Sequence, residues 1–176
     1  MITTSHIQKI LIIGPSWVGD LVMSQALYRH LKTQNPSVQI DVLAPAWALD
    51  VVKRMPEVRQ GMVLPIAHGK LALKTRYRVA KQLQQNQYDQ AIVLPNSWKS
   101  ALIPWLAKIP LRTGWRGEFR YGLLNDLRKL NKQTLPMMAQ RFVALGYSQE
   151  RPFDPTTGFL YPMLKAYQLT HPTQPV

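Results

Sequence analysis

Hydrophobic residues along the chain fall into short β-branched runs that alternate with longer, partly polar segments. Residues 9–14 (KILIIG) are an apolar run that ends in glycine, and residues 21–31 then carry apolar side chains at helical spacing. This order predicts a strand, a tight loop and a helix. Further apolar runs predict strands at residues 38–45, 62–66 and 90–97.

Helices are predicted between and after these strands, at residues 47–55, 69–86 and 98–109. The first should stop before Pro56, and Pro104 should kink the last. Because strands alternate with helices, the sequence predicts an α/β protein with a parallel sheet covered by helices on both faces.

Beyond Ile109 the alternation is lost. Residues 112–126 mix glycine, arginine and aromatic residues without a clear period, so they are predicted to form a loop with one helical turn, and a helix returns at residues 136–145. Residues 151–176 are rich in proline, which is typical of a linker or tail. The chain is therefore predicted to hold one domain, residues 1–150, followed by a tail, residues 151–176.

Composition limits the classes of protein. The 176 residues include no cysteine, which excludes disulfides and thiolate metal sites. No clustered His, Asp or Glu pattern is present, so neither a metal site nor a cofactor is predicted. The first apolar run is too short for a signal peptide or a membrane span, and we expect a cytosolic protein.

Charge changes the picture most. Lys and Arg number 22 against 9 Asp and Glu, so the net charge is +13 and the isoelectric point is near 10.3. An excess of this size favours an anionic partner. Nucleic acid, anionic lipid headgroups and phosphorylated sugars all fit.

The loop after the first predicted strand contains an unusual carboxylate. Gly14 and Gly19 have the spacing of a phosphate-binding loop, but Asp20 replaces its lysine and Leu21 its hydroxyl residue. An ionised Asp20 would repel a phosphate, which argues against a nucleotide site. The helix dipole favours the ionised form, which can accept a proton from a hydroxyl nucleophile. The alternative, that Asp20 only caps its helix, stays open.

The segment PNSWKS follows a later strand, so Asn96, Ser97 and Lys99 are expected at the same edge of the sheet. The alternative is that Ser97 caps a helix and Lys99 is a solvated charge. In RTGWRGEFR, three arginines recur every four residues with two aromatic residues between them: Arg112, Arg116 and Arg120, with Trp115 and Phe119. Guanidinium groups suit phosphate and carboxylate, and aromatic rings suit the apolar faces of sugars. A solvated basic surface is the alternative there.

Three motifs in this order resemble a known family: GPSWVGD at residues 14–20, LPNSWKSAL at 94–102 and RTGWRGE at 112–118, together with VLAPAW at 42–47. Between about residues 9 and 147 the chain resembles the N-terminal half of the lipopolysaccharide heptosyltransferases of glycosyltransferase family 9. These are inverting enzymes of the GT-B type. The resemblance implies a Rossmann-like domain that binds the acceptor, with the donor ADP-heptose bound mainly by a second such domain.

The implied reaction moves L-glycero-D-manno-heptose from ADP-heptose to the first heptose of the lipopolysaccharide inner core. The acceptor would be an anionic heptosyl-Kdo-lipid A, which also implies contact with the inner face of the inner membrane through the acceptor. By the same resemblance Asp20 is the catalytic base. The expected substrate-binding residues are Ser16, Trp17, Gly19, Asn96, Ser97, Lys99, Arg116 and Arg120.

No second set of strands and helices follows residue 151, so the donor-binding domain is expected to be absent from this sequence. Without an oriented donor, the isolated chain should be inactive or very weak. A basic nucleic-acid-binding module is the alternative function, although no helix-turn-helix or RNP motif is present. A peripheral membrane scaffold is a third, although no strongly amphipathic basic helix stands out.

Overall fold

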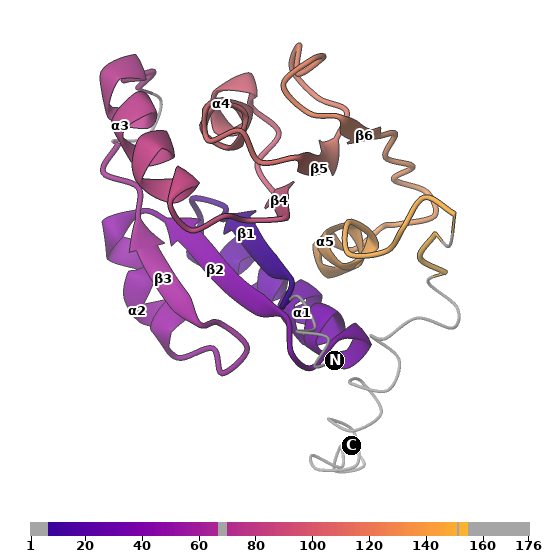
Figure 1. Ribbon diagram of the computed structural model, residues 1–176. Coiled ribbons are helices and arrows are strands. Elements are labelled where there is room, and N and C mark those ends of the chain that lie inside the picture. Colours follow the sequence, from indigo (N-terminus) through magenta and orange to yellow (C-terminus); the bar gives the residue numbers. More distant parts are fainter. Residues whose placement is uncertain (1–6, 67–69, 151, 155–176) are drawn as a thin grey trace, which may run out of the picture.

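The computed structural model describes residues 7–66, 70–150 and 152–154 (Figure 1). In these residues six parallel strands form one sheet in the order β3-β2-β1-β4-β5-β6. The strands are β1 (Lys9–Ile13), β2 (Gln39–Ala44), β3 (Gln60–Val63), β4 (Gln90–Val93), β5 (Leu111–Trp115) and β6 (Asp126–Arg128). This is the strand order of a Rossmann fold, in which the direction of winding reverses beside β1. The predicted α/β parallel sheet is confirmed.

Helices cover both faces of the sheet, as predicted (Figure 1). The helices are α1 (Val18–Gln34), α2 (Leu49–Lys53), α3 (Leu73–Gln84), α4 (Trp98–Leu106) and α5 (Met138–Ala144), with a 3-10 turn η1 (Ala46–Ala48) before α2. Side chains of α1, α2 and α5 pack on one face, and those of α3 and α4 pack on the other. Pro104 lies inside α4.

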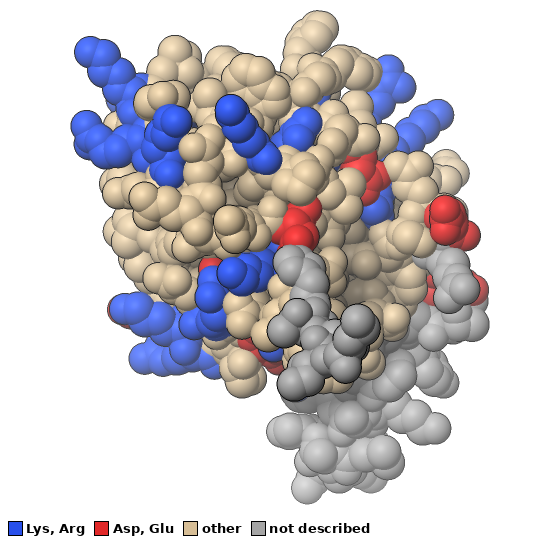
Figure 2. Space-filling model, viewed as in Figure 1, with Lys and Arg blue, Asp and Glu red and all other residues tan. Residues whose placement is uncertain are grey.

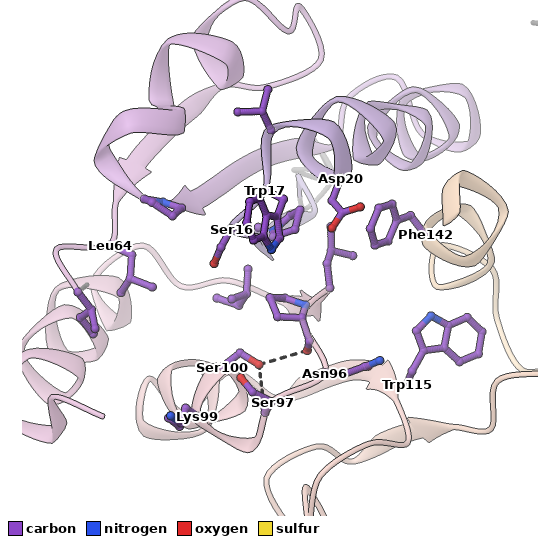
Figure 3. Close-up of a pocket in the computed structure, with 18 of the residues that line it drawn as sticks. Ser16, Trp17, Asp20, Leu64, Asn96, Ser97, Lys99, Ser100, Trp115 and Phe142 are labelled. Atoms are coloured by element: carbon purple, nitrogen blue, oxygen red, sulfur yellow. Dashed lines mark hydrogen bonds between the residues drawn. The ribbon is translucent and has the colours of Figure 1, made fainter. Parts of the chain in front are cut away.

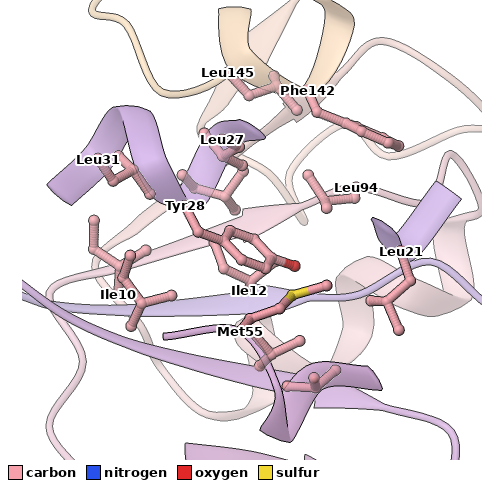
Figure 4. Close-up of a cluster of buried hydrophobic side chains, with 14 of the residues drawn as sticks. Ile10, Ile12, Leu21, Leu27, Tyr28, Leu31, Met55, Leu94, Phe142 and Leu145 are labelled. Carbon is pink, nitrogen blue, oxygen red and sulfur yellow. The ribbon is translucent and has the colours of Figure 1, made fainter. Parts of the chain in front are cut away.

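The core follows the two-residue period of the strands. Ile10 and Ile12 of β1 join the cluster beneath α1 and α5, whereas Leu11 and Ile13 join the cluster beneath α3 and α4. Figure 4 shows the first cluster, in which Tyr28 of α1 lies beside Ile12. Because β1 is buried on both faces, its four residues after Lys9 are all apolar, and three of them are isoleucine, as is typical of strands of parallel sheets.

The prediction of a loop over residues 112–126 was wrong, because this segment contains β5 and the start of β6. No alternating pattern marks β5 because its polar residues are used internally. Arg112 donates to the carbonyls of Leu123 and Ile109, and Thr113 is buried against Asp126. Gly114 is required by packing, since a Cβ there would lie 2.8 Å from Leu124 Cδ1. The expected helical turn is not present: between the two strands the chain forms non-helical turns, with a bridge between Tyr121 and Leu124.

Residue 151 and residues 155–176 of the predicted tail lie outside the described residues, so the tail stays a prediction. No helix in the described part of the chain is long and apolar enough to cross a membrane.

A buried carboxylate links strands β2 and β3 to the start of β4. Asp41 of β2 is fully buried and accepts hydrogen bonds from both Arg59 and the hydroxyl of Tyr88, the latter at 2.6 Å. The hydrogen bond to Asp41 raises the pKa of Arg59. Burial and the neighbouring Asp41 both raise the pKa of Tyr88, so its hydroxyl keeps its proton and remains a donor.

We therefore expect Tyr88→Phe to lower the free energy of unfolding by about 2 kcal/mol, because a buried hydrogen bond to a charged group is lost. Urea denaturation followed by circular dichroism measures this. Tyr77→Phe is the matched control, since Tyr77 is 54% exposed, and it should change stability by less than about 0.5 kcal/mol. Equal effects of the two substitutions would mean that Arg59 alone satisfies Asp41.

Candidate functional site

A cleft of about 1480 Å³ opens along the carboxyl edge of the sheet. The segment at the carboxyl end of every strand contributes to it, through Ile13, Pro45, Leu64, Leu94, Trp115 and Leu130. Ligands of open parallel sheets bind at this edge, beside the point where the strand order reverses. The volume exceeds the roughly 300–1,000 Å³ of pockets for drug-sized ligands and suits an extended substrate.

Asp20 lies at the centre of this edge. It is the third residue of α1, half-buried, and its carboxylate points into the cleft on the side of Phe142 (Figure 3). The N-cap residue of α1 is Trp17, and no side-chain hydrogen bond caps the helix. Among the described residues no hydrogen bond or ion pair engages the Asp20 carboxylate. The capping alternative therefore lacks support in the geometry.

The loop before α1 contributes Ser16 and Trp17 to the cleft, and the first turn of α1 contributes Gly19. The first glycine of the loop is used by the sheet, because the Gly14 N–H donates to the Leu43 carbonyl at 2.9 Å. Trp17 is 72% exposed although it is large and apolar. An exposed indole at a cleft can stack on the apolar face of a sugar.

The turn between β4 and α4 lies on the opposite side of the cleft. Asn96 is exposed there, and Ser97 and Lys99 are half-buried (Figure 3). Ser97 occupies the N-cap position of α4, but its side chain makes no capping hydrogen bond. The hydroxyl of Ser100 stabilises the turn instead, through the carbonyls of Pro95 and Ser97. Ser97 thus keeps its hydroxyl available at the cleft.

Arg120, expected to contact the acceptor, is fully buried and does not line the cleft. Its guanidinium donates to the Pro95 carbonyl at 2.7 Å, to Asn96 Oδ1 at 3.1 Å and to the Trp115 carbonyl. Burial lowers the pKa of Arg120 to about 10. The structure therefore corrects the expectation: Arg120 holds the turn after β4 against the end of β5.

Arg116 also lies outside the cleft residues. It is exposed, and its guanidinium lies 5.6 Å from the ring of Tyr121. The structure thus brings seven of the nine predicted site residues to one cleft and leaves out Arg116 and Arg120. The seven are Asp20, Ser16, Trp17, Gly19, Asn96, Ser97 and Lys99.

Sequence analysis missed further cleft residues, which come from segments with no recognisable site motif. They are Lys70, Arg76, Lys132, Arg141 and Phe142, whereas Trp115, which also lines the cleft, belongs to the RTGWRGE motif. Two of these cations support backbone: Arg76 donates to the carbonyls of Leu71 and Lys99, and Arg141 donates to those of Leu135 and Pro136.

The balance of charge in the cleft is positive. Its cations are Lys70, Arg76, Lys99, Lys132 and Arg141, and its acids are Asp20 and Glu118. The described residues hold no group of three or more His, Cys, Asp or Glu that could bind a metal ion. The cleft therefore suits a polar, anionic ligand that presents a hydroxyl to Asp20.

A Rossmann-like sheet with such a cleft is the domain type of GT-B glycosyltransferases. The fold matches the structure of Escherichia coli ADP-heptose lipopolysaccharide heptosyltransferase II with a TM-score of 0.77 and 49% identity, covering 84% of this chain and 42% of that one. The model of glycosyltransferase family 9 (heptosyltransferase) matches residues 76–170, and the chain belongs to this family.

Individual relatives agree with this assignment. The chain is 57% identical over 141 residues to lipopolysaccharide heptosyltransferase 2 of Salmonella typhimurium, which covers 80% of this chain and 40% of that protein. It is 54% identical over 166 residues to lipooligosaccharide heptosyltransferase 2 of Haemophilus influenzae, covering 94% of this chain and 46% of that protein. The chain thus spans less than half the length of these relatives. Family membership disfavours the alternative of a nucleic-acid-binding module.

The unused hydroxyl of Ser97 gives a direct test of the turn. We expect Ser97→Ala to change the free energy of unfolding by less than about 0.5 kcal/mol, whereas a capping serine would cost about 1 kcal/mol. Ser100→Ala is the matched variant and should cost about 1 kcal/mol, because its hydroxyl bonds to carbonyls of the turn. Chemical denaturation of both variants measures the difference, and the reverse order would show that Ser97 is the structural residue.

Arg120 should behave as a structural residue rather than a surface cation. Arg120→Gln leaves several buried acceptors without a donor and should lower the free energy of unfolding by about 3 kcal/mol or more. Arg116→Gln removes the same charge from an exposed position and should cost less than about 0.5 kcal/mol. Thermal and urea denaturation compare the two, and similar stabilities would contradict the structural role of Arg120.

Proposed function

We propose that this chain supplies the acceptor site and the catalytic base for heptose transfer to the lipopolysaccharide inner core. The donor is ADP-heptose, and the acceptor is the first heptose of an anionic heptosyl-Kdo-lipid A. Relatives that are 49–57% identical to it are named for this chemistry, as heptosyltransferases 2 and as an ADP-heptose lipopolysaccharide heptosyltransferase II. The donor is proposed to bind mainly to a second domain of the GT-B type.

The observation that carries the proposal is the carboxylate of Asp20, which has no hydrogen-bond or ion-pair partner among the residues that the structure describes and lies at the edge where the strand order reverses. In the proposed step, Asp20 takes the proton of an acceptor hydroxyl. The hydroxyl oxygen forms a bond to the anomeric carbon of the donor heptose, the bond from that carbon to the ADP oxygen breaks, and the configuration inverts. The electron pair of the broken bond leaves with ADP.

The cleft residues around Asp20 fit an acceptor of this kind. Trp17 offers an aromatic face to a sugar ring, and Asn96 and Ser97 offer an amide and a hydroxyl. Lys70, Lys99 and Lys132 supply positive charge for phosphate and carboxylate groups. We propose that Ser16, Trp17 and Gly19 face the reacting sugars and that Asn96, Ser97 and Lys99 face the rest of the acceptor.

Because the acceptor carries a lipid, we propose that the protein works in the cytoplasm, peripherally at the inner face of the inner membrane. The chain alone is expected to transfer heptose slowly or not at all, because Asp20 without an oriented donor loses most of the gain from proximity. Binding of acceptor and turnover therefore need separate assays.

The proposed role of Asp20 predicts that Asp20→Asn separates these two assays. Calorimetric titration of the 176-residue chain with delipidated, phosphorylated Kdo-heptose acceptor should show saturable binding, with an affinity within about threefold in the variant, because the amide keeps the shape of the carboxylate. Turnover is measured in a chimera that joins this chain to the remaining part of the E. coli enzyme. There Asp20→Asn should lower kcat at least about 100-fold.

Asp50→Asn is the matched control, because Asp50 is exposed on α2 and pairs only with Lys53 among the described residues. It should leave both binding and turnover unchanged. Near-normal turnover of the Asp20→Asn chimera, with the unsubstituted chimera active, would remove Asp20 from the reaction. No acceptor binding by a chain shown to be folded would contradict the acceptor site itself.

A further inference from the structure

The outer surface of helices α3 and α4 combines positive charge with exposed apolar side chains. We define this α3–α4 face by seven residues, Leu73, Lys74, Tyr77, Arg78, Lys81, Trp105 and Lys108, all of which are exposed. It is separate from the cleft, since none of the seven lines it.

The face belongs to a rigid layer rather than to a mobile arm. The opposite side of α3 is buried through Val79, Ala80 and Leu83, which pack in the same cluster as Ala101 and Ile103 of α4. Gln84 near the end of α3 donates to the Leu106 carbonyl of α4 at 3.0 Å, and Arg76 near its start donates to the Lys99 carbonyl at 2.9 Å. The two helices therefore lie side by side (Figure 1).

The charge of this surface has one sign. Lys74, Arg78 and Lys81 recur at helical spacing along the exposed side of α3, and Lys108 follows α4. Asp89 is the only acidic residue of the sequence between Arg59 and Arg116, and it is half-buried below the helices, where it accepts a hydrogen bond from the Lys9 N–H. Figure 2 shows blue side chains without red ones over α3 and α4, at the upper left.

Apolar side chains lie among these cations. Leu73 and Tyr77 are each 54% exposed, and Trp105 is 46% exposed. Lys81 Nζ lies 5.8 Å from the centre of the Tyr77 ring, so charge and aromatic surface alternate at close range. A face that served only solubility would need the cations without the exposed Trp and Leu.

We propose that the α3–α4 face binds the surface of an anionic phospholipid bilayer. Lys and Arg side chains are attracted to anionic headgroups, and Tyr and Trp favour the boundary between headgroups and acyl chains, where a ring can be apolar at one end and wet at the other. Nucleic acid would satisfy the cations, but it would leave Leu73 without a partner. The face binds lipid itself, independently of any sugar acceptor.

The α3–α4 face also adjoins the cleft, and the role of this arrangement rests on the proposed function. Lys70, just before α3, and Lys99, in the first turn of α4, both line the cleft, and Arg76 donates to the carbonyls of both residues. An acceptor whose lipid stays in the bilayer under the α3–α4 face can therefore extend its sugars past these lysines toward Asp20.

The test is flotation of the 176-residue chain with vesicles that contain phosphatidylglycerol and phosphatidylcholine, against vesicles of phosphatidylcholine alone. Neither vesicle contains lipopolysaccharide, so the result does not depend on the acceptor, and calorimetric titration of the same variants with acceptor reports the proposed function separately. Lys74→Gln combined with Arg78→Gln should weaken binding to the anionic vesicles at least about tenfold, since each cation near the surface contributes about fivefold.

Lys53→Gln combined with Arg54→Gln is the matched control, because it removes the same charge from exposed positions at the end of α2. It should weaken binding less than about threefold, through the smaller net charge alone. Equal losses in both double variants would overturn the proposal, because binding would then follow net charge and not this face. So would absence of binding to anionic vesicles at physiological salt.

A second readout distinguishes insertion at the interface from simple electrostatic attraction. Lipids brominated in their acyl chains should quench tryptophan emission of the bound chain, and Trp105→Phe should abolish most of this quenching while Trp47→Phe retains it. Quenching that survives Trp105→Phe would overturn the assignment of the face. Equal affinity for random oligonucleotides and for anionic vesicles, lost together in the α3 double variant, would point to nucleic acid instead.

Discussion

The reversal of strand order beside β1 determines where this domain can bind a ligand. β1 pairs with β2 on one side and with β4 on the other, and the helices that follow β1 and β4 pack on opposite faces of the sheet. The loops that leave these two strands must therefore diverge, and the crevice between them cannot be filled by either helix. Asp20 reaches this crevice from the first turn of α1 and Ser97 from the N-cap of α4, although the residues are far apart in the sequence (Figure 3).

Buried arginines make this edge rigid. Arg76 and Arg120 direct their donors mainly at backbone carbonyls of the segments that line the cleft. Burial lowers the pKa of both, yet a guanidinium stays charged at neutral pH even when its pKa is near 10. Both guanidinium groups are used in hydrogen bonds within the fold, so the net charge of +13 overstates the positive charge that is available to a partner.

Sequence pattern predicted the parts of the molecule whose side chains follow a simple period. β1, β2 and β4 were recognisable because both of their faces are buried. The segment from Gly14 to Asp20 was recognisable because its glycines have the spacing of a phosphate-binding loop while Asp20 replaces the lysine of that motif. β5 was not recognisable, because its arginine and glycine are explained only by contacts with Leu123 and Leu124. For the same reason the buried Arg120 could not be distinguished from the exposed Arg116 in one motif.

The sequence analysis predicted a helix over residues 69–86, where α3 lies, but it did not recognise that one side of this helix is basic and exposed, which illustrates a related limit. α3 buries Arg76 on its inner side and exposes Leu73 and Tyr77 on its outer side. The spacing of apolar and charged residues in the sequence therefore does not identify which side is exposed. Once burial is known, three sets of Lys and Arg residues can be distinguished around α3 and the cleft. The first donates hydrogen bonds to backbone carbonyls, the second lines the cleft, and the third covers α3 and α4 together with exposed aromatic residues. Only the last two sets are available to bind a ligand, and Lys70 and Lys99 lie at the boundary between the cleft and the α3–α4 face. A lipid-linked anionic acceptor is the kind of ligand that would use both sets at once, because its charge is divided between a bilayer surface and a sugar chain.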